Sequence, residues 1–302
     1  MSTLEALADR VAREGALTID DAPIVLGAND LITIGVMADE ARRRRHGART
    51  TFLRVFEMHV DAVPATAPPN VTAGEYRIAG APASIDAACA AVEAARRMAD
   101  SMYLTGFALH EIGRFAPSVR SFDRLKAAGL DGISETVVDE AAVPEAAIDR
   151  AREAGLIVER LTVHAVPEDP VGMLGRALAL QRTSGGFRAL APLPRKASIA
   201  APTTGYDDLK LVALARLVVA DVPSIQVDWP LYGPKLAQVA LTAGADDVDG
   251  VAGAETGVLG ARRSALEEIR GNIKAAGLQA VERDGRFAPR ADAAAGGPIG
   301  GQ

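Results

Sequence analysis

The sequence predicts an α/β protein in which a (β/α)8 barrel follows a helical N-terminal extension. From about residue 50, short β-branched runs alternate with Ala- and Leu-rich stretches of helical periodicity, and eight such runs occur. Glycines stop several of the helical stretches, as in Ala127-Ala128-Gly129 and Thr242-Ala243-Gly244. Repeated strand–helix units in this number favour a barrel over an open sheet.

The elements divide the chain into three parts. Residues 1–47 predict two helices with a capping turn at Thr18-Ile19-Asp20-Asp21, residues 48–287 the barrel, and residues 288–302 a disordered Ala/Gly/Pro-rich tail. The expected strands are 51–60, 75–80, 102–109, 132–137, 158–165, 187–192, 224–229 and 247–252. The expected amphipathic helices are 84–99, 118–128, 144–154, 169–183, 206–220, 232–243 and 262–276.

The first barrel unit departs from this pattern. Only residues 61–74 separate the first two expected strands, and they include Pro64, Pro68 and Pro69. Parallel strands need a crossover of about a dozen residues or more, usually a helix, and prolines disrupt helix interiors. Either the first barrel helix is absent or the second strand is misassigned.

Composition bounds the classes of function. Apolar residues make up 49% of the chain and charged residues 24%, as in soluble globular proteins. No apolar run reaches the length of a membrane span, and the N-terminus lacks the features of a signal peptide, so we expect a cytoplasmic protein without a membrane partner. The net charge of −6 argues against a nucleic-acid partner.

The basic run Arg42-Arg43-Arg44-Arg45-His46 falls near the end of an expected helix. It is either a solvated helix end favoured by the helix dipole or a contact for a phosphate or a partner. The single cysteine, Cys89, lies in a helical run and is expected to be a small buried hydrophobe.

Several segments between residues 15 and 287 resemble a known family. They are Leu31–Glu40, Phe56–Val60, Gly74–Gly80, Leu125–Asp131, Thr203–Lys210, Lys235–Leu241, Gly244–Gly250 and Val281–Asp284. These segments are similar to the radical S-adenosylmethionine (SAM) enzymes of the futalosine route to menaquinone, namely aminofutalosine synthase and dehypoxanthine futalosine cyclase, and to their deazaflavin-synthase cousins. The resemblance implies a barrel of the radical SAM type and a place in menaquinone biosynthesis.

The same resemblance implies a CxxxCxxC loop and a helix after the first strand, because three thiolates hold the [4Fe–4S] cluster in this family. Here the chain runs through Asp61–Asn70 without a cysteine and rejoins the pattern at Gly74. The cluster loop and the first barrel helix are therefore expected to be missing. Paired glycines that approach SAM are reduced to Gly80-Ala81-Pro82, a vestigial SAM site, so we expect neither a cluster nor SAM as cofactor. A cluster held by cysteines of another chain is the alternative.

Polar residues at the expected strand ends form the candidate site, because barrel enzymes place reacting groups there. The candidate catalytic residues are Asp228, His164, Glu135 and Glu111, and the candidate ligand-binding residues are His59, Glu57, Glu168, Arg195 and Asp249. Simpler roles stay open: His59 could be idle, His164 could bond to backbone, and Glu168 could stabilise a helix start. If residues 102–109 continue as a strand, His110 and Glu111 point to opposite faces. No HxH or HExxH spacing supports a metal site.

Two functions follow as hypotheses. The first is a clusterless pseudoenzyme of the futalosine pathway, which acts as a non-catalytic partner or ligand-binding subunit of a true radical SAM enzyme. The missing helix would leave a flank open for that partner. The alternative is a non-radical lyase, hydrolase or isomerase that acts on a futalosine-like or chorismate-derived compound at the barrel mouth. Either way the expected ligand is small, polar and nucleoside-like or aromatic.

Overall fold

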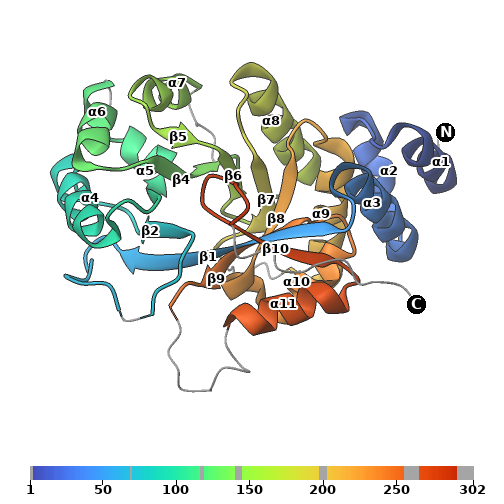
Figure 1. The fold of residues 1–302 in the computed structure, drawn as a ribbon. Coiled ribbons are helices and arrows are strands. Elements are labelled where there is room, and N and C mark those ends of the chain that lie inside the picture. The colour runs from blue at the N-terminus through green and yellow to red at the C-terminus, as the bar shows by residue number, and fades with distance from the viewer. Residues whose placement is uncertain are drawn as a thin grey trace.

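The computed structural model describes residues 3–68, 70–115, 119–139, 145–196, 203–254 and 265–290. Strands occupy its centre and helices surround them (Figure 1). The strands are β1 (Arg49–His59), β2 (Glu75–Ala79), β3 (Leu104–Ala108), β4 (Gly132–Val137), β5 (Ile157–Val158), β6 (Arg160–Val163), β7 (Ala189–Pro194), β8 (Ser224–Asp228), β9 (Asp247–Ala252) and β10 (Gln279–Arg283). The predicted strand 158–165 is thus broken into β5 and β6, and β10 was not predicted.

The sheet closes into the expected parallel barrel. Eight strands follow one another in the order β1-β2-β3-β4-β6-β7-β8-β9, and β9 pairs with β1 to complete the ring. The first half of β1 pairs with β10, in the register Arg49 to Gln279, and its second half pairs with β2, in the register Val55 to Glu75. The short β5 pairs with β4. β10 therefore extends the barrel wall at the amino-terminal end of β1.

The helices confirm most of the expected units. They are α1 (Leu4–Glu14), α2 (Ala22–Gly27), α3 (Leu31–His46), α4 (Ile85–Ala99), α5 (Leu109–Gly113), α6 (Val119–Ala128), α7 (Glu145–Glu153), α8 (Pro170–Thr183), α9 (Gly205–Val218), α10 (Trp229–Leu241) and α11 (Ala265–Ala275). Part of the expected helix 262–276 lies outside the described residues, as do residues 291–302 of the expected tail. No described helix combines the length and the apolarity that crossing a bilayer requires.

The gap between β1 and β2 is bridged without a helix in the residues that are described there. Val60 N donates to Ala79 O at 2.9 Å, and Gly74 N donates to Arg54 O at 2.8 Å, so the loop leaves and rejoins the barrel wall by backbone bonds. In between, Thr72 N reaches Gly253 O beside β9. The missing first helix was therefore predicted correctly, and the second strand was correctly assigned (Figure 1).

The N-terminal extension holds three α-helices and a short 3-10 helix, not two helices. The extra element comes from Thr18-Ile19-Asp20-Asp21, which forms the expected capping box but as the 3-10 turn Ile19–Asp21 that leads directly into α2. Figure 1 places α1, α2 and α3 together at the side of the barrel near α9. Ile34 and Met37 of α3 are buried there, so the extension covers apolar barrel surface.

The basic run at the end of α3 has a role that the sequence did not predict. Arg42 is fully buried and donates to Asp39 at 2.9 Å and to Gly47 O at 3.2 Å. Arg44 donates to backbone carbonyls at the end of α1, and Arg45 donates to Ala220 O at 2.6 Å after the end of α9. These guanidinium groups donate hydrogen bonds to carbonyls that helix ends leave unpaired, and so dock the extension on its neighbours.

Cys89 is buried on α4, as predicted, among the alanines of that helix. Burial raises the pKa of its thiol, so it is less prone than an exposed cysteine to form a thiolate.

Candidate functional site

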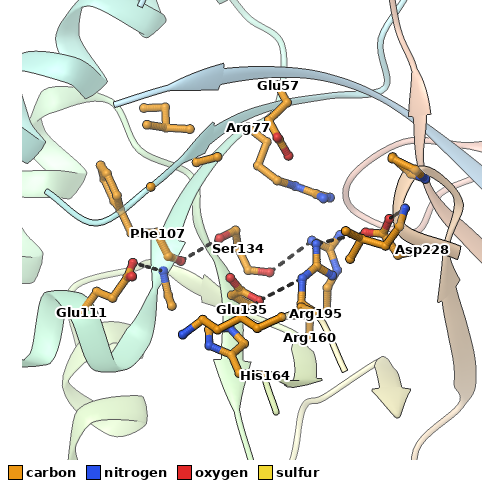
Figure 2. A pocket seen from close by; sticks show the side chains of 17 residues that line it. Glu57, Arg77, Phe107, Glu111, Ser134, Glu135, Arg160, His164, Arg195 and Asp228 are labelled. Atoms are coloured by element: carbon orange, nitrogen blue, oxygen red, sulfur yellow. Dashed lines mark hydrogen bonds and ion pairs between the residues drawn. The ribbon is translucent and has the colours of Figure 1, made fainter. Parts of the chain in front are cut away.

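A cavity of about 320 Å³ opens at the carboxyl ends of the barrel strands. Figure 2 shows that its side chains come from several strands and from the loops that follow them. The charged and ionisable residues that line it are Glu57, Arg77, Glu111, Glu135, Arg160, His164, Arg195, Lys196 and Asp228. Carboxylates and cations occur in similar number, so the cavity offers both signs of charge to one ligand.

Arg195 lies between Glu135 and Asp228 in this cavity (Figure 2). Its Nη2 contacts Asp228 Oδ2 at 3.0 Å, and its Nε lies 3.4 Å from Glu135 Oε2. His164 Nε2 lies 3.3 Å from the same Glu135 oxygen. Burial alone would raise the pKa of Glu135, but the hydrogen bond with His164 and the charge of Arg195 lower it to about 2. Glu135 is therefore ionised at neutral pH and held by two partners.

Asp228 is bound at both oxygens. Oδ2 contacts Arg195, and Oδ1 accepts a hydrogen bond at 3.0 Å from Leu231 N in the first turn of α10. The carboxylate therefore caps this helix while it anchors the guanidinium. Burial raises the pKa of Asp228, and the charge of Arg195 opposes that rise.

A second layer of ion pairs lies deeper in the barrel. Arg77 binds both oxygens of Asp249 at 2.9 and 3.0 Å and reaches Glu75 at 2.7 Å. Arg160 contacts the other Glu75 oxygen at 3.3 Å and donates to Ser134 O at 3.1 Å. Burial would raise the pKa of Asp249, but Arg160 and Arg77 bring it well below its usual range. Two carboxylates and two guanidiniums thus form a balanced polar floor under the cavity.

The backbone is strained where β3 meets the cavity. Phe107 has a φ of +62°, which is unusual for a bulky aromatic residue, and its carbonyl accepts a hydrogen bond from Ser134 Oγ at 2.7 Å. Such conformations persist where neighbours hold them, and they gather at functional sites. The strain therefore supports this cavity as the site.

The structure brings together seven of the predicted site residues. All four candidate catalytic residues line the cavity, as do Glu57, Arg195 and Gly80 from the candidate binding set. The other three predicted residues lie elsewhere: the His59 side chain is 58% exposed beside Asp61, Glu168 is exposed before α8, and Asp249 is buried in the floor.

One detail of the predicted site was wrong. Residues 110 and 111 do not extend the third strand; they lie in the short helix α5, where Glu111 Oε2 accepts a hydrogen bond from Ala108 N at 3.3 Å. Asp249 and the neighbouring Asp246 and Asp247 are all buried and paired with arginines. Contacts between elements far apart in the sequence decide these pairings.

Arg77 and Arg160 are the residues that sequence reasoning missed. Each stands in a short strand, at alternate positions with buried apolar neighbours such as Ile78 and Leu161. Interior-facing and exterior-facing residues alternate along a barrel strand, so a charged residue at an interior-facing position was the signal that could have revealed them.

The cysteine content does not fit a [4Fe–4S] cluster of the kind that the resemblance implies. The sequence holds one cysteine, and it is buried on α4 instead of lying in the loop after β1. At Gly80, with a φ of +93°, an added Cβ would lie 2.6 Å from His59 Nε2, so this imidazole already fills the space beside the glycine. The described residues contain no group of three or more metal-ligating side chains either.

Comparison with known proteins places the chain among relatives of the expected kind. Residues 188–295 match the family described as CofH/MqnC C-terminal region. A 5-amino-6-(D-ribitylamino)uracil–L-tyrosine 4-hydroxyphenyl transferase of Methanocaldococcus jannaschii is 39% identical over 103 residues, which cover 31% of this chain and 28% of that protein. An aminodeoxyfutalosine synthase of Thermus thermophilus is 37% identical over 92 residues, covering 28% of this chain and 25% of that protein.

Solved structures confirm the fold over nearly the whole chain. The [FeFe]-hydrogenase maturase HydG from Carboxydothermus hydrogenoformans has a TM-score of 0.66 at 13% identity, covering 92% of this chain and 79% of that one. Methylornithine synthase (PylB) has a TM-score of 0.60 at 12% identity, covering 93% and 98%. The chain thus has the barrel fold of these structures, and its C-terminal third is similar to the CofH/MqnC C-terminal region and to about a quarter of the length of an aminodeoxyfutalosine synthase and a hydroxyphenyl transferase.

Proposed function

We propose that this protein binds a small, polar, nucleoside-like ligand at the carboxyl end of its barrel and does not cleave SAM. The observation that carries the proposal is the 320 Å³ cavity with charges of both signs already fixed by their neighbours. Its volume falls at the lower end of the usual range for small-molecule sites, about 300–1,000 Å³. Preorganised charges lower the cost of ordering the site when a ligand binds.

The ligand class is supported by the names of the relatives. One relative acts on 5-amino-6-(D-ribitylamino)uracil and L-tyrosine, and another makes aminodeoxyfutalosine. These names denote compounds with several hydrogen-bonding groups. A cavity lined by Glu57, Lys196 and Arg77 supplies both acceptors and donors for such groups.

Binding is favoured over acid–base catalysis because the central carboxylates are engaged. Glu135 is held by His164 and Arg195, and both oxygens of Asp228 accept contacts. A general base needs a free lone pair within reach of the substrate, together with a pKa near the working pH. The pKa of about 2 makes Glu135 a weak base.

Glu57 and Lys196 are the best probes of binding, because both are exposed, line the cavity and form no side-chain ion pair in the described part of the chain. Glu57→Gln and Lys196→Gln should each weaken binding of a ribitylaminouracil or futalosine-type compound by about ten-fold, as for loss of a charged hydrogen bond. Isothermal titration calorimetry measures this directly. Glu168→Gln, an exposed glutamate outside the cavity, is the matched control and should bind normally. If no compound of this class binds, or if all three variants bind alike, the proposal is wrong.

A second candidate is non-radical catalysis by His164, favoured by its 3.3 Å contact with Glu135. A carboxylate beside an imidazole can hold one tautomer and stabilise the imidazolium. This candidate requires turnover of a futalosine-like or chorismate-derived compound that His164→Ala abolishes while ligand affinity persists. Unchanged substrate after prolonged incubation with the wild-type protein would exclude it for the compounds tested.

We also propose that the chain pairs with a radical SAM enzyme. A partner at the flank between β1 and β2 would find little apolar surface there, because Met58 and Tyr76 are buried and Phe56 is half-buried against Tyr76. Co-purification of an iron–sulfur enzyme with the tagged chain from its host tests the role, and a chain that elutes alone counts against it.

A further inference from the structure

A second cavity, of about 240 Å³, lies at the opposite end of the barrel from the candidate site. Arg49 and Thr51 line it from the start of β1, Arg188 from the residue before β7, and Ser224 from the start of β8. The end of α3 contributes Arg45. Barrel enzymes do their chemistry at the carboxyl ends of strands, so this cavity is separate from the reaction site of the fold.

Three guanidinium groups at this cavity have no carboxylate partner. Arg45 donates only to backbone carbonyls, and within the described ranges neither Arg49 nor Arg188 forms a salt bridge. The chain as a whole carries a net charge of −6, so this cluster runs against its overall charge. Uncompensated cations that share one concave surface attract an anion.

The carboxylates near this cavity are already engaged. Asp246, which itself lines the cavity, pairs with the buried Arg216 and lies 3.4 Å from His46 Nε2, and Asp247 binds Arg283 through both oxygens at 2.7 and 2.6 Å. Burial raises the pKa of Glu159 and the charge of Arg188 opposes that rise, but the two residues form no salt bridge in the described structure. These carboxylates therefore do not cancel the positive charge of Arg45, Arg49 and Arg188.

One wall of the cavity is built by a strained aromatic residue. Phe287 has a φ of +60°, a conformation that is unfavourable for a bulky residue. Its ring centroid lies 5.1 Å from the guanidinium carbon of Arg188 and 4.0 Å from that of Arg283. Asp284 accepts hydrogen bonds from Arg286 N and Ala288 N at 2.9 and 2.8 Å, which fixes the turn. The chain after β10, red in Figure 1, thus forms an ordered wall beside the cations.

We propose that this second cavity binds the phosphate group of a small molecule. Guanidinium forks match phosphate oxygens in pairs, and a phosphate carries more charge than a carboxylate, which suits three arginines that have no carboxylate partner. The hydroxyl of Ser224 lies in the same lining and can add a contact to a phosphate oxygen, whereas Thr51 Oγ1 already donates to Asp247. The phosphate comes either from free inorganic phosphate or from a phosphate monoester. The proposal is independent of the ligand at the other end of the barrel.

The test uses calorimetric titration of the full chain at low ionic strength with inorganic phosphate and, separately, with ribose 5-phosphate. We expect one site per chain, weakened about ten-fold or more by Arg49→Gln and by Arg188→Gln. Arg97→Gln is the matched control, because Arg97 is exposed on α4 and forms no salt bridge in the described ranges. Glu57→Gln, at the other cavity, should also leave phosphate binding unchanged.

Tighter binding of ribose 5-phosphate than of phosphate identifies a monoester as the ligand, and equal binding shows that the phosphate group alone is recognised. The proposal is overturned if neither compound binds, or if Arg97→Gln weakens binding as much as Arg49→Gln does. Thermal unfolding of each variant in phosphate-free buffer separates lost binding from lost folding.

Discussion

At the scale of single residues, the cavity depends on side chains that hold one another in place. Arg195 touches Glu135 and Asp228, and Glu135 in turn touches His164. Each of these residues stood at a predicted strand end, so their types and approximate places could be read from the sequence. Their pairing could not, because it depends on which strands become neighbours in the closed ring.

Glu135 predicts a pH dependence of stability. Its pKa falls from an ordinary 4.5 to about 2 in the folded protein, so the ionised form stabilises the fold at neutral pH. This contribution, on the order of 3 kcal/mol, is lost as the pH falls from about 4.5 towards 2. Burial shifts the pKa of Asp228 the other way and offsets part of the loss.

Urea unfolding at a series of pH values checks this. The free energy of unfolding of Glu135→Gln should fall less steeply than that of the wild type over the acid range. Glu168→Gln, outside the cavity, should keep the wild-type slope. Parallel curves for the wild type and Glu135→Gln would contradict the prediction.

Gly80 predicts a local steric requirement. Gly80→Ala should destabilise the fold by about 1–2 kcal/mol, because φ is +93° and the new methyl group would press on His59 Nε2. Gly271→Ala is the control: it lies within α11 with no atom near its Cβ position, and should stabilise by about 0.5–1 kcal/mol. Chemical denaturation measures both. Adding His59→Ala to Gly80→Ala should remove the steric clash with the imidazole, whereas the backbone strain at residue 80 should persist.

At the scale of elements, α9 shows how context changes a helix. The sequence predicts an amphipathic helix over 206–220, yet ten residues of α9 are buried, including Asp208, Lys210 and Arg216. The barrel covers one face, and the N-terminal extension covers another, as with Leu17 N, which donates to Leu217 O at 2.9 Å. A helix covered on several faces needs polar partners for its polar residues.

Lys210 of α9 contributes to the docking of the N-terminal extension, and this contribution can be measured. Its Nζ donates to Leu26 O at 3.0 Å and to Ala28 O at 2.7 Å, at the end of α2. Lys210→Met should cost about 1–3 kcal/mol, because these carbonyls lose their donor, and amide hydrogen exchange should quicken in α2. Lys274→Met, at an exposed site on α11, should do neither. Unchanged exchange in α2 would show that Lys210 does not hold the extension.

At the scale of the whole molecule, the barrel survives without the helix that normally follows its first strand. The ring closes between β9 and β1, and β10 adds a further strand beside the first half of β1. Backbone bonds from Gly74 and Thr72 secure the loop to neighbouring strands. The fold therefore tolerates the loss at the place where the resemblance expects a cluster loop.

The whole chain predicts no reductive SAM chemistry. Anaerobic reconstitution with iron and sulfide should leave the protein colourless, and dithionite with SAM should yield no 5′-deoxyadenosine, because one thiol cannot replace three. Cys89→Ser is the control and should behave like the wild type. A brown wild type beside a colourless Cys89→Ser would show that Cys89 takes part in a cluster and would refute the prediction.

The sequence by itself determined the barrel, the absent first helix and most of the residues at the cavity. These features follow from hydrophobic periodicity, from glycines that end helices and from segments that resemble known proteins. All of these signals lie in residues that are close together in the sequence. Tertiary structure alone decided that Arg77 and Arg160 form a polar floor, that the arginines after Asp39 dock helices, and that Phe287 walls a second cavity. Those outcomes depend on charges far apart in sequence that meet only after the ring has closed, since burial makes an unpaired charge costly and selects the partners that remain.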